Sequence, residues 1–299
     1  MRRVVCMGAA ALDLIATVDG PLGIDQRVVA HDAVLTGGGV AATAAVALAR
    51  LGVDVSIVGT VGDDDASRLV RAGLEAEGVE VGALRSVPGR PAMSPILVDR
   101  ATGARAIAAF HPDEPPLIDA AAVERGAGAA WVHVDHLGWR SVRALRAAGV
   151  TTPISLDHGN PTPDVDLALI DLYAPTEARL LERFPGLSTE AAIRAALGEG
   201  PRIVAVTRGA GGSLAGWRAA DGEVRLTDAP AFPVEVVSTL GAGDVFHGAL
   251  LAALVRDLPV PDALRHANAA AALSCRALDG RSAVPDWAGL ERFLAATPR

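Results

Sequence analysis

Strand-like and helix-like segments alternate along most of this chain, and the alternation constrains its fold more than any other feature. Residues 4–7 form a short apolar run, residues 40–51 an alanine-rich helical pattern that Gly52 ends, and residues 55–58 a second apolar run. Parallel strands joined by helices produce such a pattern. Further strands are expected at residues 131–134, 154–156, 168–173, 203–206, 213–217 and 223–226, and helices at 64–77, 242–255 and 261–278. The sequence therefore predicts an α/β fold with a mostly parallel central sheet.

Two regions interrupt the alternation. Each contains short strand-like runs with no long helix between them, at residues 13–18 and 27–35 and again at 94–99 and 105–110. We expect these runs to form a small β-sheet. It would be inserted, as residues 12–36 and 92–110, in a single domain that spans residues 1–299.

Composition limits the core and the partners. Hydrophobic residues make up 51% of the 299 residues and aromatic residues only 3%, so the core must be built from Ala, Val and Leu. The net charge of −8 argues against nucleic acid or an anionic membrane as a partner. Cys6 and Cys275 lie far apart and indicate neither a disulfide framework nor a metal cluster. Too few apolar residues follow Arg2 and Arg3 for a signal peptide, so we expect a cytoplasmic protein.

The sequence Gly241-Ala242-Gly243-Asp244 directly precedes an apolar helical run. Glycine adopts backbone angles closed to other residues, so several N–H groups can converge on one point, and the N-terminus of a helix attracts an anion such as phosphate. An acid beside that anion can take a proton from a hydroxyl that attacks phosphorus. The pattern predicts phosphoryl transfer. The alternative is an ordinary helix cap made of Gly and Asp.

Several motifs follow one another in a characteristic order. They are Gly8 with Asp13, Gly37-Gly38-Gly39-Val40-Ala41-Ala42-Thr43, Ala49-Arg50-Leu51-Gly52, Gly59-Thr60-Val61-Gly62-Asp63-Asp64, Thr207-Arg208-Gly209-Ala210-Gly211-Gly212 and Ser238-Thr239-Leu240-Gly241-Ala242-Gly243-Asp244. Over nearly the whole chain, this order resembles the ribokinase-type (pfkB) family of carbohydrate kinases. The resemblance implies an αβα sandwich with a β-sheet lid. It also implies ATP and Mg²⁺ as cofactors and an alcohol group of a sugar-like substrate as acceptor.

The resemblance assigns roles to individual residues. At the transferred phosphate they are the catalytic base Asp244 and the anion-binding Gly241, Ala242 and Gly243. At the sugar they are Asp13, Gly38, Gly39 and Thr43, at the nucleotide Thr207, Gly209, Gly212 and Asn268, and at Mg²⁺ Glu177. A carboxylate such as that of Asp13 can accept hydrogen bonds from two neighbouring hydroxyls. The alternatives are a turn residue for Asp13, a packing or surface residue for Asn268, and a first-turn helix acid for Glu177.

Three positions depart from the family pattern. Ser238 stands where the family has an Asp that helps to bind a monovalent cation, Thr43 replaces an Asn, and Ala174 replaces the Asn of an Asn-x-x-Glu segment. In finer detail, residues 241–250 and Gly280-Arg281-Ser282 most resemble the sulfofructose kinase branch. No Asn or Arg stands at the positions near residues 108–110 and 136–138 where that branch would bind a sulfonate. A sulfosugar therefore remains one candidate substrate, to which the sequence does not commit.

Other functions fit parts of the pattern. A nucleoside kinase on the same scaffold needs an apolar or aromatic shelf for the base, and aromatic residues are scarce here. A non-catalytic sugar- or nucleotide-binding relative would explain the three departures, but the retained loop at residues 241–244 argues against it. A metal site is an alternative to packing or substrate-facing roles for six histidines, His111, His133, His136, His158, His247 and His266.

The short strands of the lid also predict a homodimer. One face of a lid must cover the sugar and exclude water. The other face would expose apolar residues, and an exposed apolar patch usually marks an association surface. The residues expected there are Val28, Val34, Ile96 and Val98, with Asp13 near the shared edge.

Because Ser238 replaces a carboxylate, we expect little activation by K⁺. A hydroxyl attracts a cation less strongly than a carboxylate does, so Ser238→Asp should introduce K⁺ activation. Initial rates of ADP release in K⁺ and in a bulky organic cation, at equal ionic strength, measure the effect. A wild-type rate that rises many-fold in K⁺ would contradict the prediction.

Overall fold

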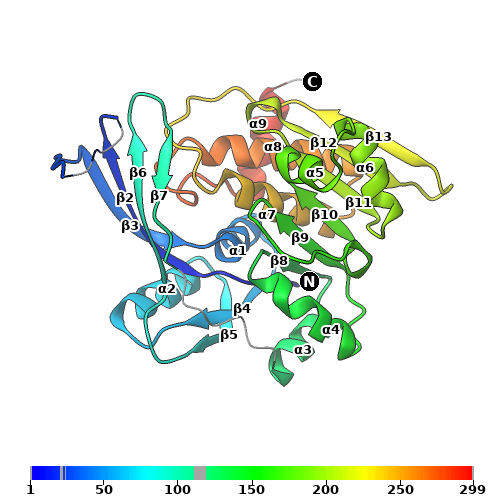
Figure 1. The fold of residues 1–299 in the computed structure, drawn as a ribbon, viewed down its shortest axis with the longest axis horizontal. Helices are drawn as coiled ribbons and strands as arrows, with labels where there is room; N and C mark the ends of the chain where they lie inside the picture. The colour runs from blue at the N-terminus through cyan, green and yellow to red at the C-terminus, as the bar shows by residue number, and fades with distance from the viewer. Residues whose placement is uncertain (1, 21–22, 24, 111–118, 298–299) are drawn as a thin grey trace.

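A computed structural model of the protein describes residues 2–20, 23, 25–110 and 119–297, and within these residues the chain forms two sheets. The strands of the larger sheet are β1 (Val4–Met7), β4 (Val55–Val61), β5 (Glu80–Ser86), β8 (Trp131–Val134), β9 (Ile154–His158), β10 (Leu172–Pro175), β11 (Ile203–Thr207), β12 (Ser213–Arg218) and β13 (Val224–Ala229). They lie in the order β13-β12-β11-β10-β9-β8-β1-β4-β5 (Figure 1). Pairing is parallel from β11 to β5, and β12 and β13 are antiparallel at one edge.

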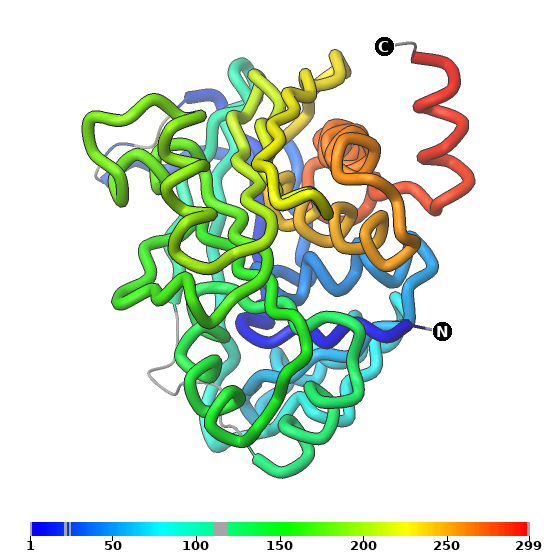
Figure 2. Tube along the Cα trace, turned by 90° about the vertical axis from the view of Figure 1, so that its right-hand side faces the viewer, coloured from blue at the N-terminus to red at the C-terminus, as the bar shows by residue number. Residues whose placement is uncertain are grey.

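Helices cover both faces of this sheet (Figure 2). One face carries α1 (Val40–Arg50), α2 (Asp65–Ala76), α7 (Ala242–Val255), α8 (Val260–Ser274) and α9 (Trp287–Ala296). The other carries α3 (Ala120–Ala127), α4 (Val142–Ala147), α5 (Glu177–Arg183) and α6 (Thr189–Gly198). Strand β1 supplies both cores, since Val4 and Cys6 lie in one apolar cluster and Val5 and Met7 in the other. The expected αβα sandwich is confirmed.

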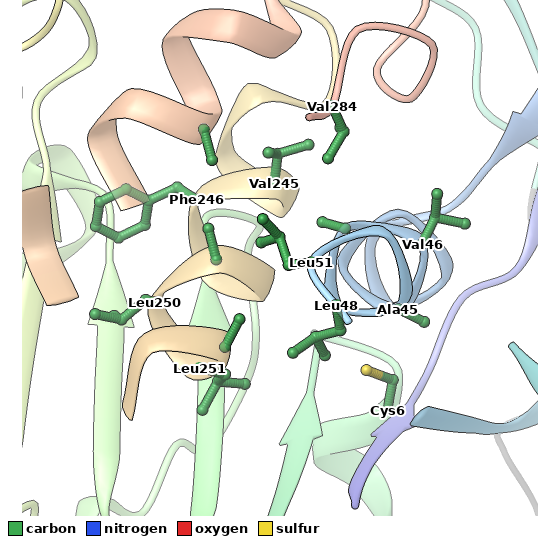
Figure 3. Packing of buried hydrophobic residues seen from close by; sticks show 14 of the residues in the cluster. Cys6, Ala45, Val46, Leu48, Leu51, Val245, Phe246, Leu250, Leu251 and Val284 are labelled. Carbon is green, nitrogen blue, oxygen red and sulfur yellow. The ribbon is translucent and has the colours of Figure 1, made fainter. Parts of the chain in front are cut away.

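Small side chains let the central helices α1 and α7 pack closely (Figure 3). A Cβ atom on Gly248 of α7 would lie 2.6 Å from the Ala44 carbonyl oxygen of α1 and 2.9 Å from the Ala47 Cβ. Only glycine fits at this crossing. Leu48, Leu251 and their neighbours fill the space beside it, so the core is built from the small and aliphatic residues that the composition predicts.

The smaller sheet stands at one side of the sandwich (Figure 1) and is called the lid sheet below. Its strands are β2 (Ala11–Val18), β3 (Asp32–Gly38), β6 (Ala92–Asp99) and β7 (Arg105–Ile107), in the order β3-β2-β6-β7. Strand β2 pairs in parallel with β6, and the two outer pairings are antiparallel.

The register of the lid sheet corrects the expected outer face. Ile96 and Val98 are 2% and 1% exposed and pack with Ile15 on the inner face, so their predicted exposure is wrong. Val34 packs against the same cluster. Because side chains alternate along a strand, their neighbours point outward. Leu14 and Leu35 face each other across β2 and β3 and are 49% and 52% exposed.

Other elements differ from expectation at their ends. The strand expected at residues 27–35 begins only at Asp32, and the one expected at 168–173 is divided into the 3₁₀ helix η2 (Leu167–Leu169) and β10. The helix expected at 261–278 ends at Ser274. Two further 3₁₀ helices are η1 (Gly138–Ser141) and η3 (Gly209–Gly211). Strand β5 and helix α9 are not among the expected elements.

Candidate active site

A cavity of about 260 Å³ lies between the lid sheet and the carboxyl-end loops of the larger sheet. The inner face of the lid sheet lines it with Asp13, Ile15, Ser94, Ile96, Arg105 and Ile107. The sandwich contributes Gly39, Thr43, His136, Asn160, Gly241 and Asp244, among others. Two carboxylates that are 231 positions apart in the numbering, Asp13 and Asp244, therefore face one cavity.

The N-terminus of α7 opens onto this cavity. Gly241 is the N-cap, with a left-handed φ of 70°, and a Cβ there would lie 2.9 Å from the Gly280 Cα. Gly243 has no heavy atom within 4 Å of its Cβ position, so the first turn is open. The first N–H groups of a helix have no acceptor within it, and the positive end of the helix dipole lies here. The turn can hold an anion beside the Asp244 carboxylate.

The Asp244 carboxyl is suited to accept a proton. Burial raises the pKa of Asp244 well above its usual value, and the charges of Asp157 and Asp135 raise it further. The charge of Arg281 lowers the pKa of Asp244. A general base works best when its pKa lies nearer the working pH than that of an exposed carboxylate.

Asp13 on β2 is 7% exposed, and glycine makes room for it. A Cβ atom on Gly38 would lie 2.0 Å from the Asp13 Oδ2 atom. Burial raises the pKa of Asp13, against the charge of Arg281 and a hydrogen bond with Ser94. The next residue, Gly39, caps α1 with a φ of 90°, and its Cβ would lie 2.6 Å from the Ala9 carbonyl oxygen. Both glycines are therefore required by close contacts.

Thr43 connects the sugar side of the cavity with α7. It is 4% exposed, and its hydroxyl accepts a hydrogen bond of 3.2 Å from Arg281 Nε. Its methyl carbon lies 3.4 Å from the Cβ position of Gly241. The four residues expected at the sugar, Asp13, Gly38, Gly39 and Thr43, thus lie together. The Thr43 hydroxyl already binds the Arg281 side chain.

The four residues expected at the nucleotide gather around the start of β12. Thr207 ends β11 and pairs with Ser213, and Gly212 turns the chain with a φ of 82° and no space for a Cβ. Gly209, with a φ of 55°, begins η3. The Asn268 amide accepts from the Ser213 hydroxyl at 2.9 Å and donates to the Ala229 carbonyl at 2.8 Å. Asn268 therefore joins α8 to β12 and β13, and its contact with nucleotide stays a prediction.

Glu177 begins α5 directly after the bridge between Thr176 and Thr207, so it lies beside the expected phosphate loop. One of its oxygens accepts a 2.7 Å hydrogen bond from Thr189, which leaves the other for a ligand. Within the described residues, no three His, Cys, Asp or Glu side chains meet in a group that could hold a metal. A single carboxylate fits Mg²⁺, which usually keeps several waters and binds substrate phosphates.

Two of the histidines lie beneath the anion-binding turn. His247 Nε2 is 3.2 Å from Asp157 Oδ2, and the His133 ring stacks on His247 at 5.8 Å. Burial lowers the pKa of His133 to about 3. His158 hydrogen-bonds the Tyr173 hydroxyl. His111 lies outside the described residues, His136 lines the cavity, and His266 stacks on Trp287.

Comparison with known proteins decides the family. A sequence model described as pfkB family carbohydrate kinase matches residues 1–287. The chain belongs to the pfkB family of carbohydrate kinases. It is therefore a phosphotransferase with an alcohol group as acceptor, as the motif order predicts.

Individual relatives of this pfkB kinase support the same conclusion. The ATP-dependent ribose-1-phosphate kinase of Halopiger xanaduensis is 31% identical, over 99% of both chains. The ribokinase of Bacillus subtilis is 29% identical over 99% of this chain and 100% of its own. The crystal structure of a putative ribokinase from Agrobacterium tumefaciens superposes with a TM-score of 0.86 at 26% identity, covering 99% and 98% of the two chains.

None of the described helices is long and apolar enough to cross a membrane.

Three residues of the site receive no role from the sequence motifs. Asp135 is fully buried and accepts four backbone N–H groups, Arg281 is 5% exposed behind the sugar side of the cavity, and Arg105 enters the cavity from β7. The only available signal for Asp135 is its place directly after a buried strand, where α/β folds often position functional side chains. Arg281 stands in the Gly280-Arg281-Ser282 segment noted above, but that segment gives it no role, and Arg105 gives no local signal, because the partners of both residues are distant in the sequence.

Gly38→Ala should displace the Asp13 carboxylate, because the new Cβ would overlap its Oδ2 atom. We expect kcat/KM for the sugar to fall by about 10- to 100-fold, as for other small misplacements of a binding group. Gly73→Ala in α2 is the control, since a Cβ there meets nothing within 4 Å and leaves the rate unchanged. Steady-state kinetics compare the two variants. Equal kinetics of Gly38→Ala and wild type would refute the close contact.

Proposed function

We propose that this kinase transfers the γ-phosphoryl group of ATP to a hydroxyl of a small sugar-like substrate held between Asp13 and Asp244. The observation that carries the proposal is the single cavity onto which both carboxylates and the open first turn of α7 face. The sugar hydroxyls would bind Asp13, with Gly38, Gly39 and Thr43 forming the wall beside it.

In the transfer step, the acceptor hydroxyl donates its hydrogen bond to Asp244. As the oxygen forms its bond to the γ-phosphorus, the proton passes to the Asp244 carboxylate and the bond from phosphorus to the ADP oxygen breaks. Gly241, Ala242 and Gly243 would direct N–H groups at the charge on the transferred group, a contribution that is usually large in such reactions. The raised pKa of Asp244 supports its role as proton acceptor.

The nucleotide would lie beyond the anion-binding turn, along the loop that contains Thr207, Gly209 and Gly212. Asn268 would support this loop through β12 and β13. Mg²⁺, when bound, would neutralise phosphate charge, and the free oxygen of Glu177 is the protein ligand proposed for it. Ser238 is 1% exposed and its hydroxyl accepts from the Leu240 N–H, so it supports the turn, and K⁺ independence stays a prediction.

A pentose or pentose phosphate is the substrate class that the relatives favour, since two of them are named for ribose and ribose 1-phosphate. Arg105 lines the cavity and would face an anionic substituent of a sugar phosphate or a sulfosugar. The likeness to the sulfofructose kinase branch stays a prediction. No Phe, Tyr or Trp of the described chain lines the cavity, so a base-stacking nucleoside site has less support.

Asp244→Asn tests the reaction. Release of ADP from Mg-ATP, measured across ribose, ribose 1-phosphate, hexoses, sulfosugars and nucleosides, identifies the acceptor. With the best acceptor, the variant should lose about 10²- to 10⁴-fold in kcat and keep its affinity for ATP. Asp65→Asn is the matched control, because Asp65 is also a first-turn helix acid but is exposed on α2. An Asp244→Asn variant with nearly unchanged turnover would exclude Asp244 as the base.

The same variant has a second readout in stability. The folded-state pKa of Asp244 lies above its unfolded-state value of about 3.9, so its stabilising contribution is complete below that pH and is lost as the pH rises through the folded-state pKa. Asn carries no charge at either pH. The melting temperature of Asp244→Asn relative to wild type should therefore be higher at neutral pH than at acidic pH. An equal difference at both pH values would contradict the raised pKa.

We also propose that the protein is a cytoplasmic homodimer joined through the outer face of the lid sheet. The exposed pair Leu14 and Leu35 supports this proposal, because two such side chains paired across neighbouring strands form an apolar patch. Asp13 precedes Leu14 on β2, which puts the interface next to the sugar-binding residue.

Leu14→Glu should separate the dimer, since it places a charge in the proposed apolar contact. Light scattering at micromolar concentration should show a dimer for wild type and a monomer for the variant. Leu187→Glu, at a residue 43% exposed between α5 and α6, is the control and should stay dimeric. A fully active wild-type monomer would reject the proposed interface.

A further inference from the structure

Arg281 is a charged side chain that the fold buries almost completely. Only 5% of the residue is exposed, in the loop between α8 and α9. Several contacts fix this loop. Asp279 accepts from the Arg281 N–H and from the Thr36 hydroxyl of β3, and Arg50 of α1 donates to the Arg281 carbonyl at 2.6 Å. The guanidinium therefore has a defined place.

That place is directly behind the sugar side of the cavity. Arg281 Nη2 donates to the Gly38 carbonyl at 2.8 Å, and Nε donates to the Thr43 hydroxyl at 3.2 Å. A Cβ atom on Gly37 would lie 2.1 Å from Arg281 Nη1. Gly37 thus makes room for the guanidinium, whereas Gly38 makes room for Asp13. The backbone of Gly37 and Gly38 therefore lies between the Arg281 guanidinium and the Asp13 carboxylate.

The charges around Arg281 indicate why it is buried there. Burial lowers the pKa of Arg281 to about 10, against the carboxylates of Asp13, Asp244, Glu77 and Asp279. Around Asp244, the carboxylates of Asp157, Asp135 and Asp13 favour the protonated form, and Arg281 favours the ionised form. Arg281 opposes protonation of Asp13 in the same way.

The two hydrogen bonds alone do not require a charge. A neutral amide can donate to a carbonyl and to a hydroxyl, and burying an ion costs several kcal/mol unless nearby opposite charge offsets the cost. Among the described residues, Arg281 forms no contact ion pair with a carboxylate. The nearby opposite charges are those of Asp13 and Asp244, which line the cavity, and those of Glu77 and Asp279, which do not.

We propose that Arg281 is a positioning residue for phosphoryl transfer. Its guanidinium holds the sugar-side wall through Gly38 and Thr43, and its charge keeps the two cavity carboxylates ionised so that they accept hydrogen bonds and a proton from the sugar. The inference rests on the proposed function, since it assigns Arg281 to the same cavity.

The test compares Arg281→Gln, Arg281→Lys and a control, Arg146→Gln, by pH profiles of kcat with the best sugar. Arg146 binds the backbone carbonyls of Val150, Thr152 and Leu169 and lies outside the cavity lining, so its variant reports the loss of a structural guanidinium. Without the Arg281 charge, the pKa of Asp244 rises. In Arg281→Gln, the acidic limb of the profile should then move up by about one pH unit. At pH values below this limb, kcat of the variant should be about tenfold lower than that of wild type, and at high pH the two should be equal.

Arg281→Lys keeps the charge but loses the planar fork of donors. The acidic limb of its pH profile should stay where it is in wild type. Its KM for the sugar should rise, because Gly38 and Thr43 are held less firmly. Arg146→Gln should lower the melting temperature without moving the profile. If Arg281→Gln does not fold, Arg281→Lys decides alone, because a displaced profile or an unchanged KM in that variant overturns the inference.

The remaining outcomes separate this inference from the proposed function. A wild-type enzyme that turns over sugar, with an Arg281→Gln variant reduced equally at every pH, would show that Arg281 is only structural. A wild-type enzyme that releases no ADP with any acceptor would overturn the proposed function and this inference together.

Discussion

The Asp135 carboxylate is the interaction on which the site most depends. Its Oδ2 atom accepts the N–H groups of Ala9 and Ala41, and its Oδ1 atom accepts those of Leu137 and Gly138. One buried side chain thereby joins the end of β1, the start of α1 and the loop after β8. Charge-assisted hydrogen bonds to backbone N–H groups are among the stronger ones in proteins, so removal of this carboxylate would release three segments of the cavity wall.

The same carboxylate belongs to a group of charged side chains that influence the pKa of Asp244. Asp135 and Asp157 raise the pKa of Asp244, and burial acts in the same direction. Opposite charge comes from Arg281 behind the cavity. Although burial disfavours its charge, the contact with His247 lowers the pKa of Asp157. The Asp244 carboxyl, whose pKa is raised, thus lies near an acid, Asp157, whose pKa is lowered.

Local patterns were sufficient for much of the fold and for the start of the helix that carries Asp244. The apolar runs give β1 and β8 at their observed bounds, and the helix at residues 242–255 is observed as expected. The small residues at 241–243 correctly predict the start of a helix, because glycine can adopt the left-handed φ of Gly241 in any sequence context. The expected outer face of the lid sheet was wrong because it depends on how the strands pair. Ile96 and Val98 point inward, whereas Leu14 and Leu35 point outward. Shifting a strand by one residue reverses its faces, and composition alone does not set that register.

The sequence by itself determined the alternation of strands and helices, the small-residue core, the family and the acid at the mouth of α7. Each of these is encoded within a few neighbouring residues or in the order of short motifs. Only the tertiary structure decided that Asp13 and Asp244 share a cavity, that Asn268 is held by Ser213 and Ala229, and that Arg281 lies behind Gly37 and Gly38. Contacts between residues more than 200 positions apart, such as Arg281 with Gly38, leave no mark in either local sequence, because their geometry exists only once the intervening sheet has assembled.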